Sequence, residues 1–215
     1  PVNDQTVSVT TTDNDVAGFT IVESGGATSV AETGTTDTFT VVLNAQPASN
    51  VVLSISSSDA GEATVTSALT FTTANWNSAQ TVTVTGADDN LVDGTQTSTL
   101  TISIVDAVTD DNFDGVADQT VSATTTDNDV AGFTIAESGG STSVSESGTT
   151  DTFTVVLNAQ PNSDVVLSIT SSDTGEATVT SALTFTAANW NSAQTVTVTG
   201  ANDSLIDGTI TSTIT

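Results

Sequence analysis

The sequence contains no lysine, arginine or histidine, so its 26 acidic side chains have no basic side chain to pair with. The formal net charge of the 215 residues is −26. Nucleic acids and anionic membrane surfaces bind proteins through basic patches, which this chain cannot form. No run of about 18 apolar residues is present for direct insertion into a membrane. Both kinds of surface are therefore excluded as direct partners.

Cysteine and tyrosine are also absent. Without cysteine there are no disulfides and no thiolate metal sites. Without histidine, cysteine, lysine or tyrosine, most general bases and activated nucleophiles are missing. Hydrolysis by a pair of carboxylates stays open in principle. The composition nevertheless predicts a protein that is not an enzyme.

A highly charged chain with few aromatic residues is often disordered. Here, however, 36% of the residues are hydrophobic. The valine, isoleucine, leucine, phenylalanine and threonine residues occur in runs of strand length, separated by Gly, Asp, Asn and Ser. We therefore expect a folded, all-β protein with an acidic surface.

The chain repeats itself with a period of 114 residues. Residues 1–101 align with 115–215, and 84 of these 101 positions are identical. The phrase TTTDNDVAGFTI, for example, occurs at 10–21 and again at 124–135. A period of this length is the size of a whole domain, so the repeat predicts a tandem array of domains. The expected boundaries are 16–129 for the first repeat and 130–215 for the second, with 1–15 as the last strand and linker of a preceding repeat.

Apolar and polar residues alternate with period two inside each repeat. In TDTFTVVL, Phe39, Val41 and Leu43 point to one side, and similar runs predict about seven strands per repeat. The fold class is therefore predicted to be all-β, with tandem antiparallel Ig-like sandwiches. Trp76 and Trp190 each precede a strand and are expected to plug one end of a core.

The points in the repeat at which the sequence begins and ends leave two interpretations open. Residues 2–12 correspond to 116–126, the last strand of a repeat, and the second repeat stops at Thr215 before its own last strand. Either the sequence is a window on a longer array, which we favour, or the surplus strand completes the second repeat of a neighbouring chain. The expected partners are thus identical repeats in tandem or in trans, with a homopolymer as the alternative.

The acidic residues concentrate at strand ends and in turns. In the first repeat the acidic residues gather at Glu32, Asp59, Glu62, Asp88, Asp89, Asp93, Asp127 and Asp129, and all but Glu32 are expected at strand ends or in turns. Two carboxylates about 4 Å apart repel by roughly 4 kcal/mol at an effective dielectric constant near 20. Several together would cost as much as the net stability of a small domain, unless cations neutralise them. Oxygen ligands with flexible spacing favour Ca²⁺ over transition metals and over Mg²⁺.

The motifs DNDVAGFTIVESGG, VAETGTTDTFTVVL, AQTVTVTGADDNLVDG and the closing TDNDVAGF resemble the Calx-β family of calcium-binding sandwiches. They also resemble the tandem extender repeats of large marine bacterial adhesins. The resemblance covers the chain twice and implies the following calcium ligands: Glu32, Glu62, Asp88, Asp89, Asp93, Asp127 and Asp129 in the first repeat, and Glu146, Glu176, Asp203 and Asp207 in the second. Asp13 and Asp15 would serve a preceding domain. Asn128 and Asn202 stand where the family often has Asp, which implies fewer or weaker ions.

A second motif is independent of that resemblance. Residues 110–115, DDNFDG, match the first half of an EF-hand loop, with Asp110, Asn112, Asp114 and also Asp118 as candidate ligands. The terminal Glu of the full loop is missing, because Val121 holds its place. A long hairpin in which Asp, Asn and Gly only form turns explains the motif equally well.

Taken together, these features predict a secreted, calcium-stiffened spacer that projects a distal domain from a cell surface. Asp37 and Asp151 are assigned to the solvated acidic surface rather than to a site. One alternative is an extracellular filament subunit that polymerises by donor-strand addition. Another is a module that binds carbohydrate or a surface, although one Trp per repeat and no Tyr offer few stacking platforms.

Overall fold

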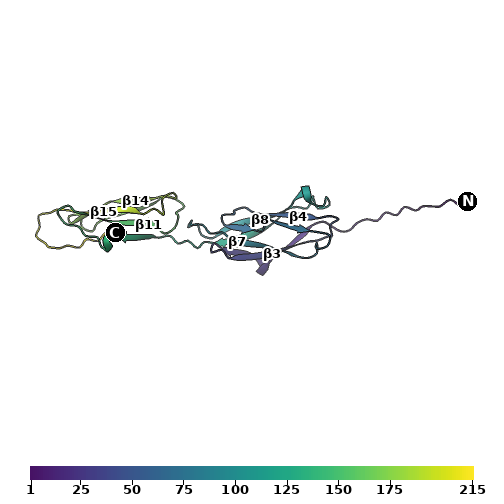
Figure 1. Cartoon of the computed structure of the whole chain (residues 1–215), viewed down its shortest axis with the longest axis horizontal. Helices are drawn as coiled ribbons and strands as arrows, with labels where there is room; N and C mark the ends of the chain where they lie inside the picture. Colours follow the sequence, from purple (N-terminus) through teal and green to yellow (C-terminus); the bar gives the residue numbers. More distant parts are fainter. The chain divides into compact units, whose positions relative to one another are not determined.

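The computed structural model describes residues 1–215 and is built almost entirely of β-strands (Figure 1). The chain forms two compact units, one with strands β1–β9 and the other with strands β10–β15. The other regular elements are three short 3-10 turns, η1 (Ser24–Gly26), η2 (Asp106–Val108) and η3 (Ser138–Gly140). No helix has the length and apolar character of a membrane span. The prediction of an all-β chain with Ig-like sandwiches is confirmed.

The first unit packs a four-stranded sheet against a five-stranded sheet, and Figure 1 shows β3 and β7 in one layer with β4 and β8 in the other. The four-stranded sheet has the order β1 (Phe19–Glu23), β3 (Thr36–Leu43), β7 (Gln80–Gly86) and β5 (Ala63–Val65). The five-stranded sheet has the order β2 (Thr28–Ala31), β9 (Gln119–Thr126), β8 (Gln96–Ile104), β4 (Val51–Ser57) and β6 (Ala68–Phe71).

The core of the first sandwich follows the alternation in the sequence. On β3, Phe39, Val41 and Leu43 are buried, as predicted. On the opposite sheet, Leu100 and Ile102 of β8 are fully buried. Each strand thus turns one apolar face inward, which is the arrangement that holds two sheets together. Trp76 packs against this core and Trp190 against that of the second sandwich, both partly buried, as expected for plugs.

Two corrections concern the strand count and the strand direction. About seven strands per repeat were predicted, but the first sandwich has nine, because β2 and β5 were not recognised. These strands have four and three residues, too few to show a clear alternation. The sandwich is also not purely antiparallel, since β2 runs parallel to β9 with Thr28 opposite Ala123.

The second unit has the same plan with fewer strands. One sheet has the order β10 (Phe133–Glu137), β11 (Thr150–Leu157), β15 (Gln194–Gly200) and β13 (Ala177–Val179). The other contains only β12 (Val165–Ser168) and β14 (Ala182–Phe185). The counterparts of β2 and β8, residues 142–145 and 210–215, are not strands, and Ile214 forms a single bridge with Ser171.

Residues 1–18 contain no strand in this structure, and the assignment of residues 2–12 to the last strand of a preceding repeat stays a prediction. Val7 and Val9, the apolar positions of that predicted strand, are 88% and 83% exposed. A strand needs a neighbour for its backbone N–H and C=O groups, and this segment has none. Alternation alone was therefore not sufficient to form a strand here.

Candidate metal centres at the acidic turns

Glu32 follows the last residue of β2 directly and is almost completely buried, with 1% of its surface exposed. Its backbone N–H donates to the carbonyl of Thr126 at the end of β9, at 3.1 Å. The preceding carbonyl, of Ala31, lies against Gly86 at the end of β7. A Cβ atom at Gly86 would be 2.0 Å from that carbonyl oxygen. Only glycine lets the end of β2 come this close, and this contact fixes where Glu32 enters the site.

The acidic turn at 88–94 begins after β7 and is shaped by its own carboxylates. Asp89 Oδ1 accepts the N–H of Leu91 at 2.7 Å, which closes an Asx turn. Gly94 has a φ of 74°, a left-handed conformation that favours glycine. The Asx turn and the left-handed glycine fix the backbone of the turn, and with it the positions from which the Asp89 and Asp93 side chains project.

Asp127 ties this turn to the segment that follows β9. Its Oδ2 accepts the N–H groups of Asp93 and Gly94 at 3.1 and 2.8 Å. Its Oδ1 accepts the N–H of Asp129 at 2.6 Å. Asp127 thus positions two neighbouring acidic residues, a role that the sequence did not distinguish from that of a direct ligand.

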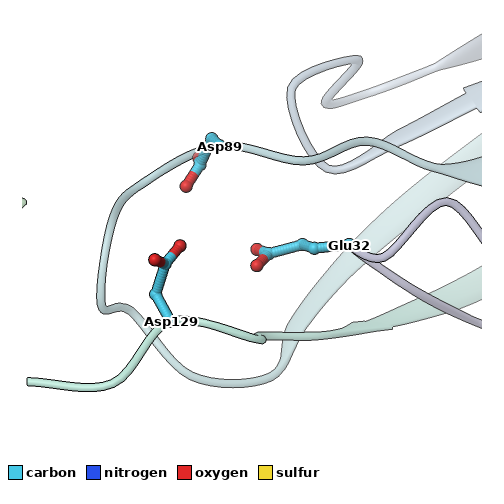
Figure 2. A group of neighbouring side chains, drawn as sticks. All are labelled: Glu32, Asp89 and Asp129. Atoms are coloured by element: carbon cyan, nitrogen blue, oxygen red, sulfur yellow. The ribbon is translucent and has the colours of Figure 1, made fainter. Parts of the chain in front are cut away.

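Carboxylates from these separate segments converge. Glu32, Asp89 and Asp129 each offer one oxygen within 4.8 Å of the others, and so do Glu32, Glu62 and Asp93. Figure 2 shows the first group, with the three side chains pointing into a common space. Glu32 belongs to both groups, and Glu62, just before β5, is 7% exposed. The arrangement could hold two cations that share Glu32.

The second sandwich contains the counterpart of one group. Glu146, Glu176 and Asp207 offer oxygens within 4.8 Å of one another, and they stand 114 residues after Glu32, Glu62 and Asp93. Burial raises the pKa of Glu176, and repulsion from Asp207, Asp203 and Glu146 raises it further. A carboxyl whose pKa is raised in the folded state destabilises the fold when it ionises, unless a cation compensates.

Other predicted ligands lie outside these three groups. Asp88 is exposed, and Asp203 accepts the N–H of Leu205 in a turn that matches the one at Asp89. Asp13 and Asp15 lie in the strandless segment before β1 and are exposed, with the N–H of Asp15 donating to Asp13 Oδ1 at 3.0 Å. This contact has the same form as that between Asp129 and Asp127.

The EF-hand-like loop uses its acidic residues internally. Asp110 is 4% exposed and accepts the backbone N–H groups of Asn112, at 3.1 Å, and of Ser49, at 2.7 Å. These two hydrogen bonds, that of Asn112 first, lower the pKa of Asp110. Phe113, inside the loop, is buried. Burial, and then a hydrogen bond with Asp106, raises the pKa of Asp114. Asp114 and Asp118 are in none of the three carboxylate groups, and both interpretations of this loop stay open.

Asp37 and Asp151 were assigned to the solvated surface, but the structure gives them a structural role. Asp37 Oδ1 accepts the hydroxyl of Ser24 at 2.6 Å and the N–H of Thr38, and Oδ2 accepts the N–H of Ser29. Asp151 repeats these contacts in the second sandwich. The Ser24 hydroxyl contributes most to holding the pKa of Asp37 below its usual value, followed by the N–H of Ser29. The sequence signal was present: DTFT at both copies places an acceptor at the start of a strand.

Replacing Asp37 should therefore destabilise the first sandwich in a pH-dependent way. Because its pKa is lower when folded, its charge stabilises the fold above the unfolded pKa of about 3.9, and the effect disappears as pH falls through the folded pKa. Asp37→Ala should lower the free energy of unfolding by about 1 kcal/mol at neutral pH. Urea unfolding of the parent protein and of Asp37→Ala, from neutral pH to pH 3, measures this difference in the free energy of unfolding. An equal loss at every pH would mean that packing, not the carboxylate, matters.

The chemistry of the three groups limits which ion they suit. All the side-chain ligands are carboxylate oxygens from loops, without nitrogen or sulfur. Hard cations take oxygen ligands, and Ca²⁺ accepts irregular sets of six to eight, whereas Mg²⁺ requires a near-ideal octahedron with several waters. Ca²⁺ is therefore the ion that the donor set fits best.

No protein-family model and no curated protein matches the sequence. Solved structures that resemble the chain include CBD12 from CALX1.2, with a TM-score of 0.36 and 13% identity over 84% of this chain and 75% of that one. Domains 1–6 of the surface layer protein SbsC have a TM-score of 0.37 and 19% identity, over 92% of this chain and 23% of that one. SSP-19 of Caenorhabditis elegans, an MSP-domain protein-like family member, has a TM-score of 0.31 and 19% identity, over 47% of this chain and 92% of that one. At these TM-scores we infer no shared ligand, partner or function from the structural similarity.

Proposed function

We propose that the chain is a non-catalytic structural repeat of an extracellular or cell-surface protein, and that bound calcium stabilises each repeat. The observation that carries this is the recurrence of one carboxylate triad at equivalent positions, Glu32–Glu62–Asp93 and Glu146–Glu176–Asp207. A solvated acidic surface would not be expected to bury Glu32 and Glu62, since a charged side chain is costly to bury. Calcium concentrations outside cells suit carboxylate sites of moderate affinity.

Calcium would act on the position of loops rather than on a reaction. An ion held by Glu32 and Asp129 would restrain the segment between β9 and β10, to which Asp129 belongs. The mechanical role follows from this: repeats whose connecting segment is restrained resist bending and can project a distal domain. Small-angle scattering with calcium and with EDTA would measure this, and calcium should narrow the distribution of maximum dimensions.

The composition supports a passive role. The chain has none of the His, Cys, Lys or Tyr side chains that most catalytic sites use. The alternative of a carbohydrate-binding module needs exposed aromatic platforms. Trp76 and Trp190 instead pack against the two cores, so that alternative gains no support.

Calcium titration of a Glu32 variant tests the proposed site directly. Glu32→Gln keeps the size of the side chain but removes a charge that both groups of the first sandwich share. We expect isothermal titration calorimetry to show the loss of the first sandwich's calcium sites, with affinity reduced at least about tenfold because a charged ligand is lost. The remaining binding should come from the second sandwich.

Asp164→Asn is the matched control for the Glu32 variant. It removes the same charge from an exposed position, and its counterpart in the first repeat, Asn50, already carries the amide. This control should bind calcium like the parent protein. Equal loss of affinity in the two variants would mean that calcium responds only to net charge, and the proposed site would be wrong.

A further inference from the structure

The first repeat contains two Asp–Gly pairs, Asp93–Gly94 and Asp114–Gly115, in different surroundings. An Asp–Gly pair can rearrange without an enzyme, when the backbone nitrogen of the glycine attacks the side-chain carboxyl carbon of the aspartate. Glycine favours this step because it has no Cβ atom beside the attacking nitrogen. The step also requires a glycine N–H that is open to solvent and a backbone that can bend. The surroundings of each pair therefore decide whether the pair reacts.

Hydrogen bonds hold the pair Asp93–Gly94. The N–H of Gly94 donates to Asp127 Oδ2 at 2.8 Å, and the N–H of Asp93 donates to the same oxygen at 3.1 Å. Asp93 is half-buried, and its side chain belongs to one of the carboxylate groups described above. The attacking nitrogen and the carboxyl group are thus both restrained, so this pair is protected.

The pair Asp114–Gly115 lies in the middle of a turn in the connection between β8 and β9. The N–H of Val116 donates to the carbonyl of Phe113 at 3.0 Å, which closes the turn around the pair. Both residues of the pair are exposed, and the N–H of Gly115 donates to no acceptor in the chain. A Cβ atom at Gly115 would meet no atom within 4 Å, so the space around the attacking nitrogen is open.

The contacts that attach this connection to the sandwich lie before the pair. Asp110 donates its N–H to the carbonyl of Asn50 at 2.9 Å and accepts the N–H of Ser49 at 2.7 Å. Phe113 is 2% exposed and belongs to the core of the first sandwich. The turn that follows can therefore bend while its N-terminal flank stays attached.

We propose that Asp114–Gly115 is a site of spontaneous isoaspartate formation. The Gly115 nitrogen forms a bond to Cγ of Asp114, and its proton leaves together with the carboxyl OH as one molecule of water. A second water then opens the resulting succinimide ring. Cleavage between the nitrogen and the main-chain carbonyl carbon of Asp114 yields isoaspartate, whereas cleavage between the nitrogen and Cγ restores aspartate. The only co-reactant is water.

Isoaspartate changes the shape of the connection but not its charge. The main chain then runs through Cβ and Cγ of Asp114, which lengthens the backbone by one carbon, and the former main-chain carbonyl becomes the free carboxylate. The hydrogen bond from Val116 to Phe113 spans this point and should be lost. The contacts of Asp110 and the buried Phe113 side chain precede it and should remain.

Ageing of the full 215-residue chain in EDTA at mildly alkaline pH tests the inference without dependence on the proposed metal centres. Endoproteinase Asp-N cuts before aspartate but not before isoaspartate, and isoaspartyl methyltransferase labels only the isoaspartate. Peptide mapping with both should show isoaspartate at Asp114 at least about tenfold faster than at Asp93, because a hydrogen bond to a carboxylate must break before Gly94 can attack. In urea, where both pairs are unfolded, the two rates should be similar.

Gly115→Ala is the matched variant, because its Cβ shields the attacking nitrogen and contacts no other atom. It should melt like the parent when followed through Trp76, and it should form little isoaspartate at Asp114. Equal rates at Asp114 and Asp93 in the folded parent would overturn the inference. So would a rate at Asp114 that folding slows as strongly as it slows the rate at Asp93. A Gly115→Ala variant that reacts as fast as the parent would rule out attack by the nitrogen of an unhindered glycine.

Discussion

Millimolar calcium is expected to raise the melting temperature of both sandwiches by more than sodium chloride of equal ionic strength does. The oxygens of Glu32, Glu62 and Asp93 lie within 4.8 Å, so without a cation they repel by roughly 3 kcal/mol per pair at an effective dielectric constant near 20. A ligand that binds only the folded state adds about 2.7 kcal/mol at 100 times its dissociation constant. For a domain of this size the rise is on the order of 10 °C per site.

The tryptophans allow the two sandwiches to be followed separately. Trp190→Phe leaves Trp76 to report on the first core, and Trp76→Phe leaves Trp190 to report on the second. Fluorescence melts of both variants in EDTA, in calcium and in matched sodium chloride should show the larger calcium shift in the first sandwich, which has two carboxylate groups against one. Equal shifts in the two salts would mean that calcium only screens the charge of −26.

Period-two alternation was sufficient to predict the strands that carry the cores. Phe39, Val41 and Leu43 are buried because each long strand has one apolar face and one polar face. Because 84 of the 101 aligned positions are identical, the second sandwich could be predicted from the first. The residues of the carboxylate triads were also predictable, because turns with several Asp residues have few uses in a chain that has no basic side chain.

Long-range contacts could not be predicted in the same way. The segment TSVA became β2 because it pairs in parallel with β9, far along the chain, and its four residues contain no sign of this. The role of Asp127 depends on backbone N–H groups of Asp93 and Gly94, which no residue pattern reveals. The sequence identifies the acidic residues of the candidate site, but the fold determines which carboxylates converge and which hold the loop.

Residues 5–12 and 119–126 show that position in the sheet outweighs local sequence. The two segments are identical at seven of eight positions, yet only the second is a strand. β-propensity measures how a residue fits a pleated surface beside neighbours, and the first segment has no neighbours in this structure.

Gly86→Ala is expected to destabilise the first sandwich and to weaken its calcium binding together. The new Cβ would be 2.0 Å from the carbonyl oxygen of Ala31, a backbone atom that can move only if the end of β2 moves. Such overpacking costs about 3 kcal/mol when backbone must shift. Glu32, the next residue, would be displaced from both carboxylate groups. Melting followed through Trp76 should show the loss of stability, and titration the loss of affinity.

Gly115→Ala is the matched control for Gly86→Ala. A Cβ at Gly115 meets no atom within 4 Å, and its backbone is not left-handed, so both stability and calcium affinity should remain close to those of the parent. Gly200→Ala should reproduce the effect in the second sandwich, because its Cβ would be 2.0 Å from the carbonyl oxygen of Ser145, just before Glu146. If Gly86→Ala lowered stability but left calcium affinity unchanged, the end of β2 could shift without moving Glu32 from its ion. The close approach of these two strands would then serve packing alone, and Glu32 would reach the site by the flexibility of its own side chain.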